Sequence, residues 1–410
     1  MPDGHATTTA TPFGGAFPGS HRTHVLTFVT DQASETALRE GLAEVADAIE
    51  ARRGGIAVAC TALQKLATPR VLVVDMTGEE QPLIALGGLA DVVEPDVTVL
   101  VIGEQKDMEF YRAVTRTLGA MEYLAKPLTR DLVARHFAPI VRGHATSAEG
   151  VTGGRLVSVT GVRGGVGASM IAVSLAWHFG VTMRRHTVLL DGDLYRGTAA
   201  LLLDVDPGLG LAATLEAPER IDTLLAERVA LPAADRLHVL ASQCDLGREI
   251  DCAPGAAGTL IDTLRRRYNA IIADAPFGAS ALQRDLMKHA QQRILVLTPT
   301  LPSVRDTLRM LALCREQLPP QRPVLVLNRL GIPGGLARAQ IEEALRVKVD
   351  VVIPDLPRQV NSAALLGAPA AGSGAFRTSI LQLAQEVGLV RGSDADPAPK
   401  RRGILGFWRR

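Results

Sequence analysis

The stretch GVRGGVGAS, residues 161–169, directly follows an apolar run, RLVSVT (155–160), and leads into an apolar helical segment. Gly164, Gly165 and Gly167 let the backbone turn tightly and direct its N–H groups inward. Such amides, together with the first turn of a helix, bind phosphate oxygens. A Gly-rich turn that binds nothing is the alternative, but the strand–loop–helix context favours a phosphate-binding loop.

The last residue of the loop is a candidate metal ligand. Ser169 stands where a hydroxyl coordinates the Mg²⁺ ion that accompanies a bound nucleotide. The candidate nucleotide-binding residues are consecutive along the loop and the first turn of the helix: Gly164, Gly165, Val166, Gly167, Ala168, Ser169 and Met170.

Two acidic motifs lie downstream of the loop. LLDGDLYRG (189–197) ends a predicted strand in Asp191 and Asp193, and AIIADAP (270–276) ends another in Asp274. Each acid alone is more often a solvated loop residue or a helix cap. Beside a phosphate loop, acids at strand ends can hold Mg²⁺ and can orient an attacking water molecule. We assign the Mg²⁺ ligands to Ser169, Asp191 and Asp274.

Composition excludes several classes of protein. Of 410 residues, 47% are apolar and only 4% aromatic, which is typical of doubly wound α/β cores. The net charge of +1 provides no general field for nucleic acid. The four cysteines form no CxxC pair, which argues against an iron–sulfur cluster. No apolar run approaches the roughly 20 residues of a spanning helix. Residues 1–22 lack an apolar signal segment, so we expect a cytoplasmic protein.

The chain divides into five predicted parts. These are a disordered tail (1–22), a receiver-like domain (23–142), a small-residue linker (143–154), a P-loop domain (155–392) and a basic tail (393–410). The P-loop domain alternates strands and helices and is expected to form a large doubly wound sheet. In the front domain a helix is predicted over 34–53, and strands are predicted at VLTFV (25–29), IAVAC (56–60), VLVVD (71–75), VTVLVI (97–102) and MEYLA (121–125).

The order of the motifs carries a resemblance to a known family. The loop, LLDGD (189–193), IIADAP (271–276), LVLNR (325–329) and IPD (353–355) together resemble the MinD/ParA deviant-Walker ATPases over about residues 155–390. The GGVGAS form of the loop looks like the TadZ/CpaE branch, which helps to place tight-adherence (Flp) pilus machinery. That branch also carries an atypical receiver domain in front.

The resemblance implies several functional properties. It implies ATP and Mg²⁺ as ligands, a homodimer that encloses two nucleotides, and pilus assembly proteins as partners. It also implies that Asn328 contacts adenine and that the segment from Pro354 packs against the base. It further implies that Asp193 orients the hydrolytic water. Localisation would be cytoplasmic, or peripheral at the inner face of the membrane or at a cell pole.

The loop departs from the family pattern K-G-G-x-G-K-[ST]. Arg163 replaces the first lysine, which in the family reaches the phosphates of the partner, and Ala168 replaces the second. Phosphate binding rests mainly on backbone amides and is expected to survive these changes. Hydrolysis is expected to be slow or absent, with Arg163 and Asp193 as the residues that would carry it.

The front domain resembles a response-regulator receiver. Asp75 falls at the phosphoacceptor position, and Lys126-Pro127 falls at the Lys-Pro pair, where the X–Pro bond is often cis. Thr30-Asp31 supplies at most one of two Mg²⁺-binding acids, and Gly103-Glu104 replaces a Ser or Thr. A receiver-shaped domain without phosphotransfer is therefore expected.

The basic tail ends in KRRGILGFWRR (400–410), which places Ile404, Leu405 and Trp408 on one face if it is helical. This pattern suits an anionic membrane surface, and a frayed end is the alternative.

Two other functions remain open from sequence. One is a ParA-type DNA or cargo partitioning ATPase, which the near-zero net charge disfavours, and the other is a non-catalytic scaffold.

Overall fold

The computed structural model describes residues 25–44, 49–66, 69–95, 97–142, 154–278, 281–367, 369–372 and 374–387. By their contacts these residues form two compact units. The first holds the described residues up to Gly78, with Val97–Lys106 and those from Ala120 to 142. The second holds Glu79–Asp96, Asp107–Gly119 and the described residues from 154 onward. Glu79–Asp96 and Asp107–Gly119 fall within the range predicted from the sequence for the front domain (23–142).

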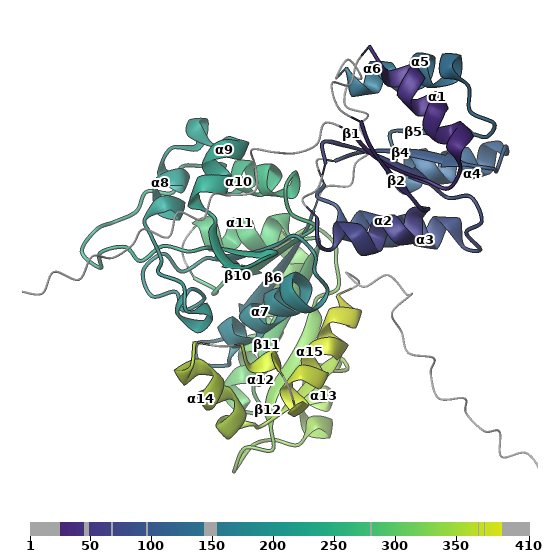
Figure 1. The fold of residues 1–410 in the computed structure, drawn as a ribbon. Helices are drawn as coiled ribbons and strands as arrows, with labels where there is room; N and C mark the ends of the chain where they lie inside the picture. Colours follow the sequence, from purple (N-terminus) through teal and green to yellow (C-terminus); the bar gives the residue numbers. More distant parts are fainter. Residues whose placement is uncertain are drawn as a thin grey trace, which may run out of the picture. The chain divides into compact units, whose positions relative to one another are not determined.

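The first unit contains a sheet of five parallel strands in the order β2-β1-β3-β4-β5, which is the flavodoxin-like order of doubly wound sheets (Figure 1). The central strands are apolar and fully buried because helices cover both faces. The strands are β1 (Val25–Val29), β2 (Ile49–Arg53), β3 (Val71–Asp75), β4 (Thr98–Gly103) and β5 (Glu122–Ala125). The helices of this unit are α1 (Gln32–Leu42), α2 (Ile56–Leu63), α5 (Arg130–His136) and α6 (Ala138–Val141).

Two predictions for the front domain are wrong. The run IAVAC forms the start of helix α2, and the predicted helix over 34–53 ends at Leu42. The second strand is instead the polar segment IEARR, which pairs with β1 at the edge of the sheet and is only half-buried. Gly54, at φ +138°, makes the turn between β2 and α2. An edge strand lacks the apolar run of a buried one, so the sequence pattern did not reveal it.

The second unit is built on a sheet of eight strands in the order β13-β12-β11-β6-β10-β7-β9-β8. Seven strands are parallel, and they include the apolar run before the loop and the two predicted strands that end in Asp191 and Asp274; the short edge strand β8 is antiparallel. The strands are β6 (Arg155–Gly161), β7 (Thr187–Asp191), β8 (Leu231–Ala234), β9 (Leu237–Leu240), β10 (Ala270–Asp274), β11 (Gln292–Leu297), β12 (Val324–Leu330) and β13 (Val351–Pro354).

Helices cover both faces of this sheet (Figure 1). On one face lie α7 (Ala168–Trp177) and α15 (Gly374–Glu386), and on the other lie α10 (Ala256–Arg265), α11 (Ala281–His289), α12 (Leu301–Gln317) and α13 (Arg338–Leu345). The unit also contains α3 (Pro82–Val92), α4 (Met108–Arg112), η1 (Ala113–Thr117), η2 (His178–Thr182), η3 (Leu201–Leu203), α8 (Gly210–Glu216), η4 (Pro218–Arg220), α9 (Thr223–Val229), α14 (Pro357–Leu365) and η5 (Ala370–Gly372).

This arrangement brings the predicted motifs to one edge of the eight-stranded sheet. Strands β6, β7 and β10 are parallel neighbours, so the segments that follow Gly161, Asp191 and Asp274 meet at their carboxyl ends. Ligands of open α/β sheets bind at this edge.

Among the described residues, no helix is both long and apolar enough to cross a membrane. Both predicted tails (1–22 and 393–410) and residues 143–153 of the predicted linker lie outside the described residues.

Candidate functional site

The phosphate loop connects β6 to α7 at the carboxyl edge of the sheet. Gly165 and Gly167 have φ values of +78° and +91°, which side-chain-bearing residues rarely adopt. A Cβ atom at Gly164 or Gly165 would meet nothing within 4 Å, so open space lies beside this half of the loop. Gly167 is the N-cap of α7, and the first amides of that helix therefore face the loop without partners inside the helix. The geometry is that of an anion-binding nest.

Two buried carboxylates lie beside the loop. Asp191 and Asp274 are register partners on the adjacent strands β7 and β10, and both are almost fully buried. Burial, together with the neighbouring Asp191, raises the pKa of Asp274 to about 7, although Ser169 donates a hydrogen bond to it. Burial also raises the pKa of Asp191 to about 6. Among the described residues no cation forms an ion pair with either carboxylate, and a cation bound beside the pair would stabilise the ionised forms that burial disfavours.

Asp191 also organises the loop that follows β7. Its Oδ1 accepts a hydrogen bond from Asp193 N at 3.0 Å, and its Oδ2 accepts one from Ala199 N at 3.0 Å. A Cβ atom at Gly197 would lie 2.3 Å from Asp191 Oδ2, so the loop wraps closely around this carboxylate. Asp193 caps the next turn, because its Oδ1 accepts from Tyr195 N and Arg196 N.

This set of donors fits a Mg²⁺ ion that is shared with a nucleotide. Among the described residues, no group of three or more His, Cys, Asp and Glu side chains could hold a metal alone. Mg²⁺ in nucleotide sites is bound by one or two protein oxygens together with phosphate oxygens and water. Ser169, with the uncompensated pair Asp191 and Asp274, offers such oxygens and the charge to match them.

Asn328 and Pro354 lie at the ends of the two outermost strands on the β13 side of the sheet. Asn328 is buried near the end of β12, and its Nδ2 donates to Val166 O in the phosphate loop at 2.8 Å. Pro354 ends β13 and is the register partner of Leu330. The structure thus brings Asn328 to the loop, and it places Pro354 on the strand next to that of Asn328.

Arg163 extends from the loop and is 40% exposed. Its Nη1 lies 3.9 Å from Oδ2 of Asp306, on helix α12, which is beyond hydrogen-bond range. Asp306 was not identified from the sequence as a contact of Arg163. Asp306 directly follows Arg305 in a helical segment, and such a dipeptide has no local feature that points to a contact with a distant loop.

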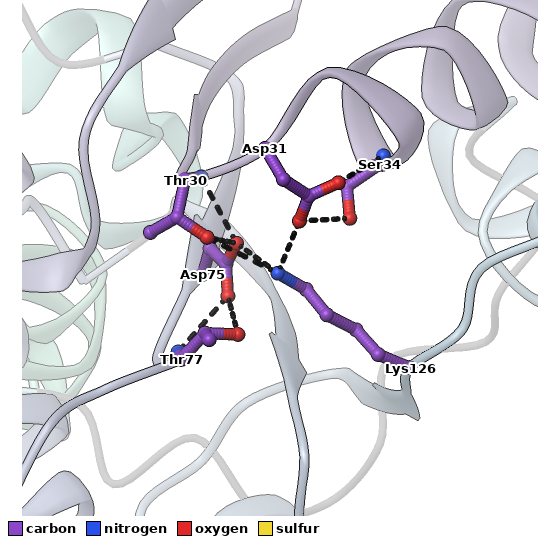
Figure 2. A network of polar contacts seen from close by, with 6 residues as sticks. All are labelled: Thr30, Asp31, Ser34, Asp75, Thr77 and Lys126. Carbon is purple, nitrogen blue, oxygen red and sulfur yellow. Dashed lines mark hydrogen bonds and ion pairs between the residues drawn. The ribbon is translucent and has the colours of Figure 1, made fainter.

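The first unit holds a separate polar network around Asp75, which is fully buried at the end of β3 (Figure 2). Its Oδ2 accepts from Thr30 N at 3.0 Å, from Thr30 Oγ1 at 2.6 Å and from Lys126 Nζ at 2.6 Å. Its Oδ1 accepts from Thr77 N at 3.0 Å and from Thr77 Oγ1 at 2.6 Å. Thr77 was missed from sequence, although Asp-x-Thr is the spacing of a side-chain-to-backbone turn.

Lys126 joins two carboxylates in this network. Its Nζ lies 2.6 Å from both Asp75 Oδ2 and Asp31 Oδ2, and the Lys126-Pro127 bond is cis, as is often found at such a pair. Asp31 also accepts from Ser34 N and Ser34 Oγ, and so caps helix α1.

The pKa values of the network follow from these contacts. Burial alone raises the pKa of Asp75, but hydrogen bonds from Lys126, Thr30 and Thr77 outweigh it and lower the value. For Asp31, burial is likewise outweighed by hydrogen bonds from Lys126 and Ser34, which lower its pKa to about 2. Burial lowers the pKa of Lys126, but the two carboxylates raise it overall. The ionised forms of all three groups are therefore stabilised.

Comparison with known sequences identifies relatives of part of the chain. No protein-family model matches the chain. It is 27% identical over 221 residues to an uncharacterized ATP-binding protein of Methanocaldococcus jannaschii. The matched stretch covers 51% of this chain and 78% of that protein. It is 27% identical over 184 residues to the septum site-determining protein MinD of Synechocystis, which covers 43% of this chain and 65% of that protein. The chain thus spans just under two thirds of this MinD.

Solved structures share the fold. A ParA-family ATPase from Chlorobium tepidum superposes with a TM-score of 0.53 at 22% identity, over 57% of this chain and 98% of that one. The MinD protein of Pyrococcus horikoshii, solved in complex with Mg-ADP, superposes with a TM-score of 0.50 at 24% identity, over 57% of this chain and 95% of that one. With the loop and the two acidic strand ends at the same sheet edge, the second unit of this chain has the P-loop fold of the MinD and ParA ATPases.

Proposed function

We propose that the chain is a nucleotide-dependent positioning factor that binds ATP and Mg²⁺ as a MinD/ParA-type homodimer. The observation that carries this proposal is the nest at Gly164–Ser169 beside the buried pair Asp191 and Asp274. Two buried carboxylates with raised pKa values beside an anion-binding loop form a site whose charges are complementary to a metal–nucleotide complex.

Each group of residues has a distinct part in this proposal. The loop amides bind phosphate oxygens, and Ser169 with Asp191 and Asp274 would hold Mg²⁺ directly or through water. Asn328 and Pro354 border the base, and Asp193 orients a water molecule. The bound ion would neutralise charge on the transferred phosphoryl group.

Hydrolysis is proposed to be slow. Ala168 removes the cation that would lie along the β- and γ-phosphates, a loss of about 1.5–3 kcal/mol for one charge-assisted contact. Arg163 is the loop's remaining cation.

We expect ATP with Mg²⁺ to convert the protein from monomer to dimer, because each nucleotide would supply phosphate contacts to both protomers. Analytical ultracentrifugation at tens of μM, with ATP, ADP or no nucleotide, measures this. The variant Asp274→Ala, which removes one predicted Mg²⁺ carboxylate, should stay monomeric with ATP. A wild-type protein that stays monomeric with ATP and Mg²⁺ would contradict the proposal.

The proposed cellular role is the placement of tight-adherence pilus machinery. The GGVGAS loop and the flavodoxin-like unit in front support this role over DNA partitioning. Pilin and pilus ATPase genes beside the gene for this chain would favour it. The alternative ParA-type function requires tight nonspecific DNA binding, which a filter-binding assay at low salt detects. The proposed membrane contact of residues 400–410, and localisation at the cytoplasmic face or a pole, concern a segment outside the described residues.

We also propose that the first unit is a receiver-shaped module that does not accept phosphate. Both oxygens of Asp75 are already occupied by donors from Thr30, Thr77 and Lys126. Phosphorylation would require Asp75 to leave these hydrogen bonds, which are worth about 1.5–3 kcal/mol each when one partner is charged.

Incubation with acetyl phosphate and Mg²⁺ is therefore expected to leave the mass of the protein unchanged. Intact-protein mass spectrometry measures this, with a working receiver treated in parallel as the positive control. Addition of one phosphate that disappears in Asp75→Asn would show that the site is a functional phosphoacceptor.

A further inference from the structure

We infer that Asn328 positions the phosphate loop, a role separate from contact with the base. This inference rests on the proposed function in one respect, namely that a nucleotide binds at the loop. The resemblance to the ATPase family implies only an adenine contact for this residue. The structure shows its side chain amide already engaged with the protein.

Both polar atoms of the Asn328 side chain have protein partners. Nδ2 donates to Val166 O at 2.8 Å, across 162 positions of the chain, and Oδ1 accepts from Arg329 N at 2.9 Å. The residue is only 7% exposed, so water competes little for these bonds. A buried amide with both ends engaged has a defined orientation.

The phosphate loop is shaped to receive this side chain. A Cβ atom at Gly167 would lie 2.5 Å from Asn328 Nδ2, closer than any real contact, so only glycine allows the approach. The side chain of the preceding Val166 is buried in the core beside α7. Residues 166 and 167 are thus held from both sides, whereas Gly164 and Gly165 border open space.

Holding the carbonyl of Val166 also orients the next amide. The peptide unit between Val166 and Gly167 is planar and trans, so its N–H points opposite to its C=O. With Val166 O directed at Asn328, the N–H of Gly167 is directed away from Asn328. One hydrogen bond from β12 therefore sets the direction of an amide in the middle of the nest.

Strand β12 is distorted at this residue. The register between β12 and β13 shifts between Leu327 and Leu330, which is the mark of a bulge. Arg329 has φ +59°, a conformation that costs a residue with a side chain roughly 1 kcal/mol or more. Bulges occur next to functional sites, where they re-aim side chains, and Asn328 lies within this one.

The inference predicts that Asn328→Ala weakens phosphate binding even when no base is present. We expect affinity for inorganic tripolyphosphate, measured by isothermal titration calorimetry, to fall about five- to tenfold, and affinity for ATP to fall by at least that factor. Gln291→Ala is the matched control: the Gln291 side chain also bonds to the backbone, at Leu156 N at the other end of β6, and its loss should leave both affinities unchanged.

Hydrogen exchange of the nucleotide-free protein provides an independent readout. Amides of residues 162–168 should exchange faster in Asn328→Ala and Asn328→Asp than in the wild type, and at the wild-type rate in Gln291→Ala. Asn328→Asp keeps an acceptor for Arg329 N and replaces the donor to Val166 O with a carboxylate oxygen that cannot donate when ionised, so it serves if the alanine variant does not fold. The exchange measurement tests the inference even if the wild type binds no nucleotide. Absence of nucleotide binding would contradict only the proposed function.

The inference is overturned if Asn328→Ala weakens ATP binding but leaves both tripolyphosphate affinity and loop exchange unchanged. Asn328 would then recognise only the base. Unchanged loop exchange in a folded Asn328→Asp variant would likewise overturn it.

Discussion

Replacing Lys126 with methionine is expected to destabilise the first unit by about 3–5 kcal/mol, because it leaves a buried charge without its partner. Asp75 is fully buried, and the Lys126 side chain is only 14% exposed. The change should lower the melting temperature of this unit by roughly 12–40 °C, at about 4–8 °C per kcal/mol for a unit of this size. Hydrogen exchange resolved by peptide measures the protection of β1, β3 and β5 separately from that of the second unit. The loss of stability can therefore be assigned to the first unit.

Arg39→Ala is the control for this prediction. Arg39 forms an ion pair with Glu35 at 3.0 Å on the surface of α1 and is 55% exposed. Such exposed pairs contribute about 0.3–0.5 kcal/mol. The double variant Asp75→Asn with Lys126→Met should recover part of the lost stability, because the unpaired charge is gone. If Lys126→Met is no more destabilising than Arg39→Ala, the network does not stabilise the unit.

The same network sets the pH range of the first unit. The pKa values of Asp75 and Asp31 are lowered in the folded state, so their contribution to stability is present above the unfolded value of 3.8 and is lost as pH falls below it, in the case of Asp31 toward pH 2. The pKa of Lys126 is raised above 10.5, so its contribution is present below that pH and is lost as pH rises further. Lys126→Met lacks the cation that lowers these pKa values, so its deficit in stability relative to the wild type, followed by the same exchange measurement, should shrink as pH falls below 3.8 and the carboxyl groups become protonated.

The sequence predicted the large sheet well for a physical reason. Strands such as AIIAD (270–274) and TVLLD (187–191) are buried on both faces. They therefore appear in the sequence as short apolar runs, which can be recognised without knowing the strands they pair with. Edge strands carry no such signal. IEARR is polar, and β8 contains Pro232, so neither could be recognised without its pairing partner.

The candidate sites were predictable in part for a similar reason. Glycines and strand-terminal acids mark the phosphate loop and its acidic neighbours by chain position alone. Contacts between distant segments have no local pattern. The bond from Asn328 to Val166 and the approach of Asp306 to Arg163 arise only when β12 and α12 pack beside the loop.

Arg163→Ala is expected to reduce ATP-dependent dimerisation by more than tenfold, with much less effect on nucleotide binding by the monomer. Arg163 is held only weakly by its own chain, since Asp306 lies 3.9 Å away and the side chain is 40% exposed. Exposed pairs of this kind contribute at most about 1 kcal/mol. Bidentate hydrogen bonds from a guanidinium to phosphate are worth about 1.5–3 kcal/mol each, so release from Asp306 toward a partner's phosphates is favourable.

Arg305→Ala is the matched control, because Arg305 also pairs with Asp306 but lies on α12 outside the loop. It should dimerise as the wild type does. Arg163→Lys keeps the charge but loses the planar fork, and we expect it to dimerise between the wild type and Arg163→Ala. Sedimentation velocity over a range of protein concentrations measures all four proteins.

Turnover provides the second measurement of the same role. A cation supplied by a partner accelerates related P-loop enzymes by about 10³–10⁵, so Arg163→Ala should abolish any ATPase activity that the wild-type dimer shows. Wild-type turnover should itself lie far below the roughly 1–100 s⁻¹ of kinases, because Ala168 replaces the lysine that would lie along the β- and γ-phosphates. Dimerisation of Arg163→Ala at the wild-type level would show that the residue acts only within its own protomer. Turnover at kinase rates would show that the protein is an ordinary ATPase and not a slow switch.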